Sequence, residues 1–357
     1  MVMERKRARE FGIRIGSLEP GRLNAITDVK GVGVGHVTLI QGESIRTGVT
    51  AITPHPGNIY EKKVIAAVEA FNAFGKSTGL LQVMHMGVIE TPILLTDTLN
   101  TWRVADAVLD YFKERYNFTP KTLNPIVGET NGGFLNDSFG RHVRKEHVFE
   151  AIDKARSTEG RGRVEEGNVG GGTPMIGYGL KGGIGTASRM YENITVGVLV
   201  QLNCGRREDL IINGVPVGKE LNVPRPQRGE GGSIMIIVAT DLALTSRQLW
   251  KLARRSIIGL ARTGSYSSVT SGDFVIAFTT GEKNVEDFKE SIKKGGFNGN
   301  ELFLNPLYKA VAEATEEAII NALFKAETMT GVNNNIVYEL PYDQVEDIFK
   351  KYGRTID

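Results

Sequence analysis

The sequence predicts an α+β fold, in which strands and helices follow one another in irregular order. Segments rich in β-branched residues come in runs, and only a few stretches show the three- and four-residue spacing of an amphipathic helix. A strict alternation of strands and helices would instead favour a doubly wound parallel sheet. Glycine is also frequent, with 43 of the 357 residues, about 12% against a usual ~7%. These glycines gather in motifs, which predicts tight turns and close approaches of backbone to backbone or ligand.

The first half of the chain is predicted to be rich in strands. Gly31, Gly33 and Gly35 alternate with valines, which places Val32 and Val34 on one face of an extended segment. The predicted strands cover residues 26–39 (two strands around a glycine turn), 50–54, 64–70 and 124–127. The predicted helices cover residues 97–116, with Trp102, Ala105, Val108, Leu109 and Phe112 at helical spacing, and residues 146–155.

The second half combines strands and helices around a polar connector. A β-branched strand is predicted over residues 194–202 and stops at Asn203. The proline-containing segment 222–232 has the composition of an exposed loop, and Ser233 then begins an apolar run that predicts a buried strand. The elements predicted after it are a helix over 242–260, a strand over 274–278 and a helix over 305–323 with Leu307, Val311, Ala314 and Ala318 on one face.

Composition restricts the class of protein. With 41% hydrophobic and 24% charged residues, the chain is expected to be an ordinary soluble globular protein with a large core. A formal net charge of +2 is too balanced to indicate nucleic acid or a membrane as the main partner. The basic start, residues 4–9, is expected to be a frayed terminus and not a signal peptide. The single cysteine, Cys204, excludes internal disulfides, so we expect a cytoplasmic protein.

Familiar ligand-binding and catalytic motifs do not occur in the sequence. Residues 31–36 lack the third glycine of a dinucleotide fingerprint, and residues 181–186 place a lysine before the glycines, unlike a P-loop. No Gly-x-Ser-x-Gly elbow occurs, and Cys204 has no evident histidine partner. No metal and no cofactor are therefore expected. The histidines lack metal-ligand spacing and are expected to be structural or surface residues: His36, His55, His85, His142 and His147.

The most informative stretch is the glycine-rich segment 228–232, which ends on Ser233. The Gly232–Ser233 bond is exposed there to attack by the Ser233 hydroxyl. Cleavage would make Ser233 a new N-terminus with a nucleophile and an amine on one residue. A freed α-amine, whose pKa is ordinarily about 7.7–8.0, suits a general base at neutral pH. This pattern predicts a self-activating amide hydrolase, and the alternative is an ordinary turn serine.

Three further residues have the chemistry that such a serine needs. Asn203 ends a predicted strand and offers a side-chain N–H to the oxygen of a tetrahedral intermediate. Ser271 and Asp273 lie two residues apart before a predicted strand, so their side chains point to the same side. They are expected to orient the amine and the nucleophile. Each of the three also fits a role as a capping or turn residue, and the residues alone leave both interpretations open.

Several long motifs in the same order resemble one known family. The chain is similar to the self-processing L-aminopeptidase D-amidase/D-esterase and β-peptidyl aminopeptidase group over nearly its whole length. Ornithine acetyltransferases resemble it as a more distant branch with a threonine nucleophile. The matching motifs are ITDVKGVGVGH at 26–36, TGVTA at 47–51, GVIETPI at 87–93, GNVGGGT at 167–173, KGGIGTASR at 181–189 and GGSI at 231–234.

The resemblance implies a fold, a processing event and residue roles. The fold would be a four-layer α/β/β/α sandwich formed by residues 1–357 as a single domain, cleaved by the chain itself into 1–232 and 233–357. Ser233 would be the N-terminal nucleophile, with Asn203 as the oxyanion donor. Ser271 and Asp273 would be the orienting pair, although some relatives have Glu at the latter position. The substrate would be bound by Glu129, through its free ammonium, and in the same segment by Asn131. Some relatives have an active-site tyrosine near this segment, where this chain has Asn131 and Phe134.

The resemblance also implies the activity. We expect an aminopeptidase that releases N-terminal residues from small peptides, amides or esters with a free amine, working as a homo-oligomer, a tetramer of processed units. An acyltransferase using the same acyl-enzyme is an alternative. A catalytically silent protein that binds a small amino compound is another, and it would remain one band on denaturing electrophoresis. The sequence does not distinguish among D-, L- and β-aminoacyl substrates.

Overall fold

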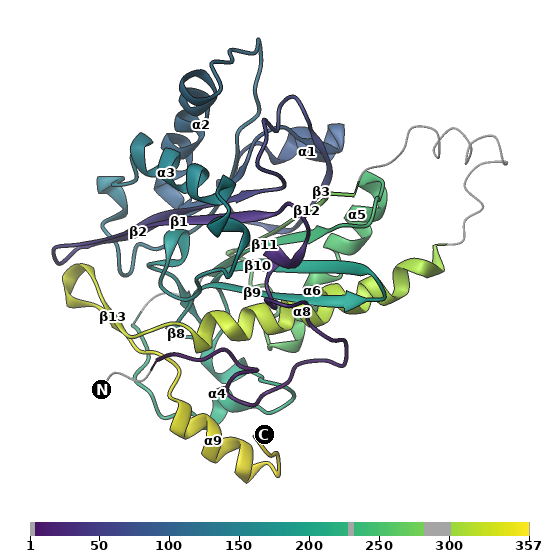
Figure 1. The fold of residues 1–357 in the computed structure, drawn as a ribbon. Helices are drawn as coiled ribbons and strands as arrows, with labels where there is room; N and C mark the ends of the chain where they lie inside the picture. Colours follow the sequence, from purple (N-terminus) through teal and green to yellow (C-terminus); the bar gives the residue numbers. More distant parts are fainter. Residues whose placement is uncertain (1–3, 228–231, 282–300, 357) are drawn as a thin grey trace.

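The computed structural model describes residues 4–227, 232–281 and 301–356, so the glycine-rich run at 228–231 lies outside the described residues. Within the described part, two β-sheets stack on each other and helices cover both outer faces (Figure 1). The predicted α+β class is confirmed, and the layers follow the α/β/β/α order that the resemblance implied.

The smaller sheet consists mainly of residues from the first third of the chain. Helices α2 and α3 cover its outer face, where Val49, Leu94 and Val127 pack against Val108 and Ile152. Its strands, in spatial order, are β1 (Gly33–Gln41), β2 (Ile45–Thr53), β5 (Ile93–Asp97) and β6 (Ile126–Thr130). The covering helices are α2 (Thr101–Arg115) and α3 (Lys145–Arg156).

The larger sheet brings distant parts of the chain together. Its strands, in spatial order, are β4 (Val88–Ile89), β3 (Val64–Ala73), β12 (Ser271–Thr279), β11 (Gly232–Thr240), β10 (Ile194–Asn203) and β9 (Gly183–Tyr191). Neighbouring strands are antiparallel except for the parallel pair of β11 and β12. Its outer face is covered by α5 (Ser246–Ala253), α6 (Ser256–Arg262) and α8 (Asn305–Phe324).

Side chains on the central strands alternate between two cores. On β11, Met235 and Ile237 lie in the core between the sheets, whereas Ile234 and Ile236 lie in the core under the helices. A strand buried on both faces needs a continuous apolar sequence, and the run after Ser233 has that character. This alternation determines on which face of the sheet each site residue lies.

The remaining elements lie at the ends and edges of the sandwich. The β7–β8 hairpin contacts β10 near the end of that strand. The other short elements are α1 (Leu80–Met86), β7 (Ile176–Gly177), β8 (Leu180–Lys181), α4 (Val217–Glu220), β13 (Met329–Thr330), β14 (Ile336–Val337) and α9 (Tyr342–Lys351).

Two sequence-based predictions in the first half are wrong in detail. Ile26–Asp28 forms a 3₁₀ helix instead of a strand, because the Asp28 carboxylate accepts the N–H groups of Leu23 and Ala25 and closes a turn. In α2, Trp102 is 56% exposed, although its spacing predicts a place on the apolar face. The buried face is formed by Val104, Ala107, Val108, Tyr111 and Phe112.

Two predictions in the second half also need correction. The single helix expected over 242–260 is two helices, α5 and α6, and the first begins at a Thr245 cap that accepts the N–H of Gln248. Ser271 and Asp273 lie within β12 and do not precede it, because both are paired in the sheet opposite Gly232 and Ile234.

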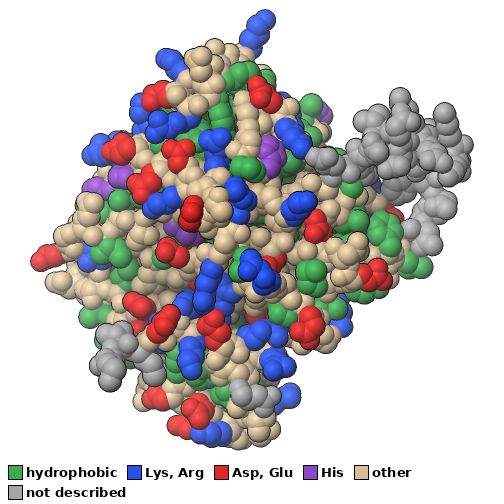
Figure 2. Space-filling model, in the orientation of Figure 1, with side chains coloured by type: hydrophobic (Ala, Val, Ile, Leu, Met, Phe, Trp, Pro, Cys, Tyr) green, Lys and Arg blue, Asp and Glu red, His purple; other side chains and the backbone are tan. Residues whose placement is uncertain are grey.

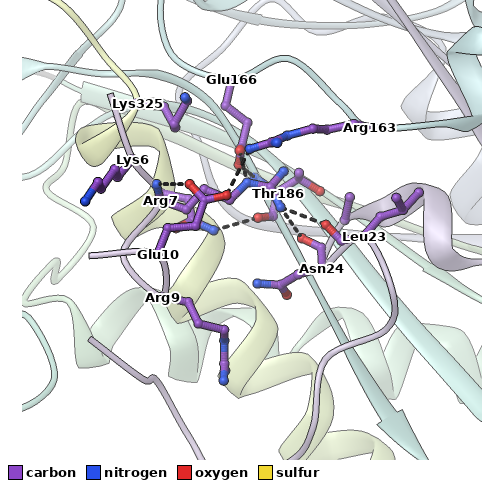
Figure 3. A network of polar contacts seen from close by, with 12 residues as sticks. Lys6, Arg7, Arg9, Glu10, Leu23, Asn24, Arg163, Glu166, Thr186 and Lys325 are labelled. Carbon is purple, nitrogen blue, oxygen red and sulfur yellow. Dashed lines mark hydrogen bonds and ion pairs between the residues drawn. The ribbon is translucent and has the colours of Figure 1, made fainter. Parts of the chain in front are cut away.

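An ion-pair network attaches the N-terminal segment to the sandwich (Figure 3). The Arg7 guanidinium pairs with the buried Glu166 carboxylate and donates to the Leu23 and Asn24 carbonyls. Glu166 in turn accepts the N–H of Thr186 on β9 at 2.8 Å. Burial raises the pKa of Glu166, and Arg7 opposes that rise. The buried charge is therefore compensated by a partner and hydrogen bonds.

The surface carries both charge signs. Figure 2 shows Lys and Arg side chains interspersed with Asp and Glu over the face in view, in keeping with the small net charge of +2. In the described residues, no helix combines the length and the apolar character that crossing a bilayer requires.

Candidate active site

Ser233 lies at the foot of β11, in the middle of the larger sheet. It is paired with Asn203 on the antiparallel strand β10 and with Gly272 on the parallel strand β12. Its side chain shares the inter-sheet face with Met235, and the residue is 8% exposed. Ser233 is thus a buried hydroxyl held between two neighbouring strands.

Gly272 leaves room for the Ser233 hydroxyl. The Gly272 N–H donates to Ser233 Oγ at 3.1 Å. A Cβ at position 272 would lie 2.5 Å from the Phe74 carbonyl oxygen and 3.0 Å from Ser233 Oγ. Only glycine fits this space without displacing a neighbour, and reasoning from the sequence did not single it out. Its one signal in the sequence is a glycine between two polar residues at the start of an apolar run.

Gly232 is required for a similar reason. A Cβ there would lie 2.7 Å from Cys204 Cα and 3.0 Å from the Asn203 carbonyl oxygen. The backbone of residue 232 therefore runs directly against the end of β10. This close approach fixes the Gly232–Ser233 peptide bond beside Asn203.

The Asn203 amide is held in one orientation. Its Oδ1 accepts the N–H of Ile176 at 2.9 Å, and its Nδ2 donates to the Asn131 carbonyl at 3.0 Å. Asn203 is 2% exposed and directly opposite Ser233 across the strand pair. Because Oδ1 is engaged by Ile176, the N–H₂ end of the amide must point the other way, where one N–H remains beyond the bond to Asn131.

Ser271 and Asp273 form a pair on the other face of the sheet. The Ser271 hydroxyl donates to Asp273 Oδ1 at 2.6 Å. Burial raises the pKa of Asp273, opposed by hydrogen bonds from Ser271, Ser267 and the Ile234 N–H. Their alternation with Gly272 places both side chains on the helix side of β12, away from Ser233 Oγ. They therefore flank the backbone around residues 232–234 and not the hydroxyl.

A cavity of about 310 Å³ opens beside this pair. Gly232 and Ser271 line one side of it, and Tyr266 and Ser267 lie on the loop before β12. The cavity thus reaches Gly232, the first residue of the Gly232–Ser233 bond. A new N-terminus formed there would lie next to the Ser271 hydroxyl.

Glu129 and Asn131 lie at the end of β6 in the smaller sheet. Glu129 is 3% exposed, accepts the Lys76 N–H at 2.7 Å and bonds the Thr98 hydroxyl. The loop that carries Lys76 follows Phe74, whose carbonyl approaches Gly272. Within the described residues Glu129 has no hydrogen bond to Ser233, but β6 packs on β11 across the inter-sheet core, where Met235 lies against Gly128. Asn131 is exposed and meets Asn203 through its backbone carbonyl.

The described residues offer no cluster of metal ligands, at Ser233 or elsewhere. Across residues 4–227, 232–281 and 301–356, no three His, Cys, Asp or Glu side chains form a group that could hold a metal ion. Cys204 is buried, as expected for a small apolar residue. Buried His36 bonds Thr50 through Nδ1, and burial, with Lys154 nearby, lowers its pKa to about 4.

Two stacked sheets between two layers of helices define a fold class, that of the Ntn hydrolases. The comparisons with known proteins identify the group within it. The model of "Peptidase family S58" matches residues 24–337. The chain therefore belongs to peptidase family S58 and is a serine aminopeptidase.

Individual relatives agree with this assignment. The β-peptidyl aminopeptidase BapA of Sphingosinicella xenopeptidilytica is 40% identical over 96% of this chain and 91% of its own length. The structure of a Burkholderia sp. β-aminopeptidase matches with a TM-score of 0.88 and 39% identity, covering 98% of this chain and 100% of that one. The L-aminopeptidase D-Ala-esterase/amidase of Ochrobactrum anthropi, described as a variant of the Ntn hydrolase fold, matches with a TM-score of 0.86 and 36% identity, covering 98% and 99%.

Proposed function

We propose that Ser233 is the nucleophile of a self-processing aminopeptidase that acts on small peptides, amides or esters with a free amine. The observation that carries the proposal is the position of Ser233, directly opposite Asn203 and bonded to Gly232, which lines the cavity together with Ser271. Within the described residues no histidine bonds Ser233, so the serine needs another base, and its own amine, once freed, would supply one.

The first step of the proposal is cleavage of the chain. Ser233 Oγ attacks the Gly232 carbonyl carbon, the C–N bond breaks, and the proton of the hydroxyl passes to the nitrogen. Water then hydrolyses the ester, which leaves a Gly232 carboxylate and a Ser233 α-amine. The missing side chain at residue 232 keeps this carbonyl against the end of β10. There the Asn203 amide can donate to the developing oxyanion.

The second step of the proposal is turnover of substrate. The Ser233 amine takes the hydroxyl proton as Oγ attacks the substrate carbonyl, and then gives a proton to the leaving amine. Ser271 and Asp273, which flank the backbone at 232–234, hold that amine in place. Glu129 binds the substrate's ammonium and thereby selects the N-terminal residue. The names of the relatives favour β-aminoacyl and D-alanyl compounds among the substrates to be tried.

Denaturing electrophoresis with N-terminal sequencing tests the proposal. The purified protein should give two fragments, residues 1–232 and 233–357, and the second should begin with Ser233. Ser233→Ala should stay one chain and be inactive on aminoacyl p-nitroanilides. Ser157→Ala, which alters a serine at the end of α3, should be cleaved normally. A fully active protein with an intact chain would refute the proposal.

A further inference from the structure

Lys181 is a buried lysine that the proposed chemistry does not use. It ends β8, is 0% exposed and is one of the largest fully buried side chains among the described residues. Its Nζ donates to the Met175 and Gly182 carbonyls, both at 2.8 Å, and to the Gly172 carbonyl at 3.4 Å. Burial lowers its pKa well below the ordinary value. These three partners of Nζ are all backbone oxygens.

The bonds from Lys181 to those oxygens hold the backbone before and after the β7–β8 hairpin in place. Residues 172–177 lead into the β7–β8 hairpin, and the Gly182 N–H donates back to the Met175 carbonyl at 2.9 Å. A Cβ on Gly182 would lie 2.7 Å from the Leu202 carbonyl oxygen, so the hairpin packs directly on the end of β10. An apolar side chain could fill the position of Lys181, but it could not bond these carbonyls.

The same segment carries the group that orients Asn203. Ile176 follows Met175 in the chain, and its N–H donates to Asn203 Oδ1 at 2.9 Å. Two groups orient the amide: the Ile176 N–H bonds Oδ1, and the Asn131 carbonyl accepts from Nδ2. Without the Ile176 donor, only the bond to Asn131 would oppose rotation of the amide, whose two ends have nearly the same shape. The position of the Met175–Ile176 peptide therefore helps to decide whether Asn203 presents its N–H₂ group or its oxygen towards the serine.

We propose that Lys181 is a positioning residue for the oxyanion donor. Through the Met175 carbonyl it fixes the Ile176 N–H, and through that N–H it keeps Asn203 Nδ2 directed towards Ser233. The inference rests on the proposed role of Asn203 as oxyanion donor. Lys181 itself does not touch the reacting atoms.

A double-mutant cycle separates this role from general support of the fold. The four proteins are the wild type, Lys181→Met, Asn203→Ala and the double variant. The rate of self-cleavage is followed by denaturing electrophoresis, and kcat and KM are measured on the matured proteins with an aminoacyl p-nitroanilide. We expect Lys181→Met to lower the cleavage rate and kcat about 10- to 100-fold with little change in KM, because one misdirected oxyanion donor costs about 10²–10³ in rate. In the Asn203→Ala background, Lys181→Met should lower the cleavage rate and kcat by less than about twofold.

Tyr178→Phe is the matched control for hairpin stability. Tyr178 is fully buried in the same hairpin, and its hydroxyl bonds the Thr263 hydroxyl at 2.6 Å, whereas the Asn203 amide bonds Ile176 and Asn131. This variant should lower the Tm and leave kcat within about twofold. If Lys181→Met does not yield folded protein, Lys181→Gln, which keeps a donor for the carbonyls, enters the same cycle.

The outcomes of the cycle distinguish the positioning role of Lys181 from the proposed oxyanion role of Asn203. An equal loss from Lys181→Met with and without the Asn203 amide would overturn the positioning role, because a purely structural defect acts in both backgrounds. Full activity and normal cleavage in Asn203→Ala alone would instead overturn the proposed function of Asn203. A loss of kcat that occurs only where the Asn203 amide is present supports the inference.

Discussion

Replacing Gly272 by alanine tests how closely the sheet is built around the proposed nucleophile, Ser233. The new Cβ would lie 2.5 Å from the Phe74 carbonyl oxygen and 3.0 Å from Ser233 Oγ. An ordinary contact is about 3.5 Å, so the Cβ must separate by roughly 1 Å from the Phe74 oxygen and by roughly 0.5 Å from the hydroxyl. The Phe74 carbonyl is held by the chain on both sides, so the backbone at residue 272 must shift, and its N–H is the group that bonds Ser233 Oγ. We therefore expect the serine side chain to be displaced.

The expected cost follows from that displacement. A misplacement of about 1 Å at a reacting group lowers a rate roughly 10²-fold, whereas overpacking costs about 1–3 kcal/mol of stability. Gly272→Ala should thus fold, with a lower Tm, and cleave itself and its substrates about 100-fold more slowly. Time-resolved electrophoresis and p-nitroanilide kinetics measure both rates. Gly57→Ala, where the added Cβ meets only the His55 ring at 3.3 Å, is the control. Wild-type rates in Gly272→Ala would refute the reasoning.

Three further changes have defined outcomes. Asn203→Ala should lower self-cleavage and kcat about 10²–10³-fold in the same assays, and unchanged rates would exclude its role. Glu129→Gln should raise KM for aminoacyl substrates about 10- to 100-fold, because a charge-assisted bond becomes neutral, and it should leave esters without an amine unaffected. Burial lowers the pKa of His36 from 6.5 to about 4, so only the unfolded state gains this proton between those values, and stability falls as the pH drops through that window. Urea titrations should show His36→Gln losing less stability there, by up to about 3 kcal/mol, and identical pH profiles would contradict the assignment.

The position of Ser233 and the common side of Ser271 and Asp273 could be predicted from the sequence because these signals are local, although it was the resemblance that singled the pair out. A Gly-Gly-Ser sequence before an apolar run predicts a serine at the foot of a buried strand, and Ser233 lies there. Ser271 and Asp273, two residues apart on a strand, point to the same side and share a hydrogen bond. These features depend only on the alternation of side chains along one strand.

The relations between strands could not be predicted in the same way. Asn203 faces Ser233 because β10 and β11 are neighbours in that register, and Gly272 does so because β12 lies parallel to β11. No residue within any one of these segments indicates which strand lies beside it or in which register. For the same reason the sequence did not indicate that Ser271 lies on the opposite face from the hydroxyl, nor that Lys181 bonds the turn beside Asn203. Both depend on contacts between distant segments.

The strand order of the larger sheet has a consequence for any protein cut before Ser233. Strands β11 and β12 lie between β10 on one side and β3 on the other, so the later piece is inserted in the middle of the earlier one. The two pieces cannot dissociate without breaking the hydrogen bonds of two strand pairs, β3 with β12 and β10 with β11. Once separated, they would have to find each other by diffusion. Recovery from denaturation should then become slower on dilution for the cut form alone, while the uncut Ser233→Ala chain recovers at a rate independent of concentration.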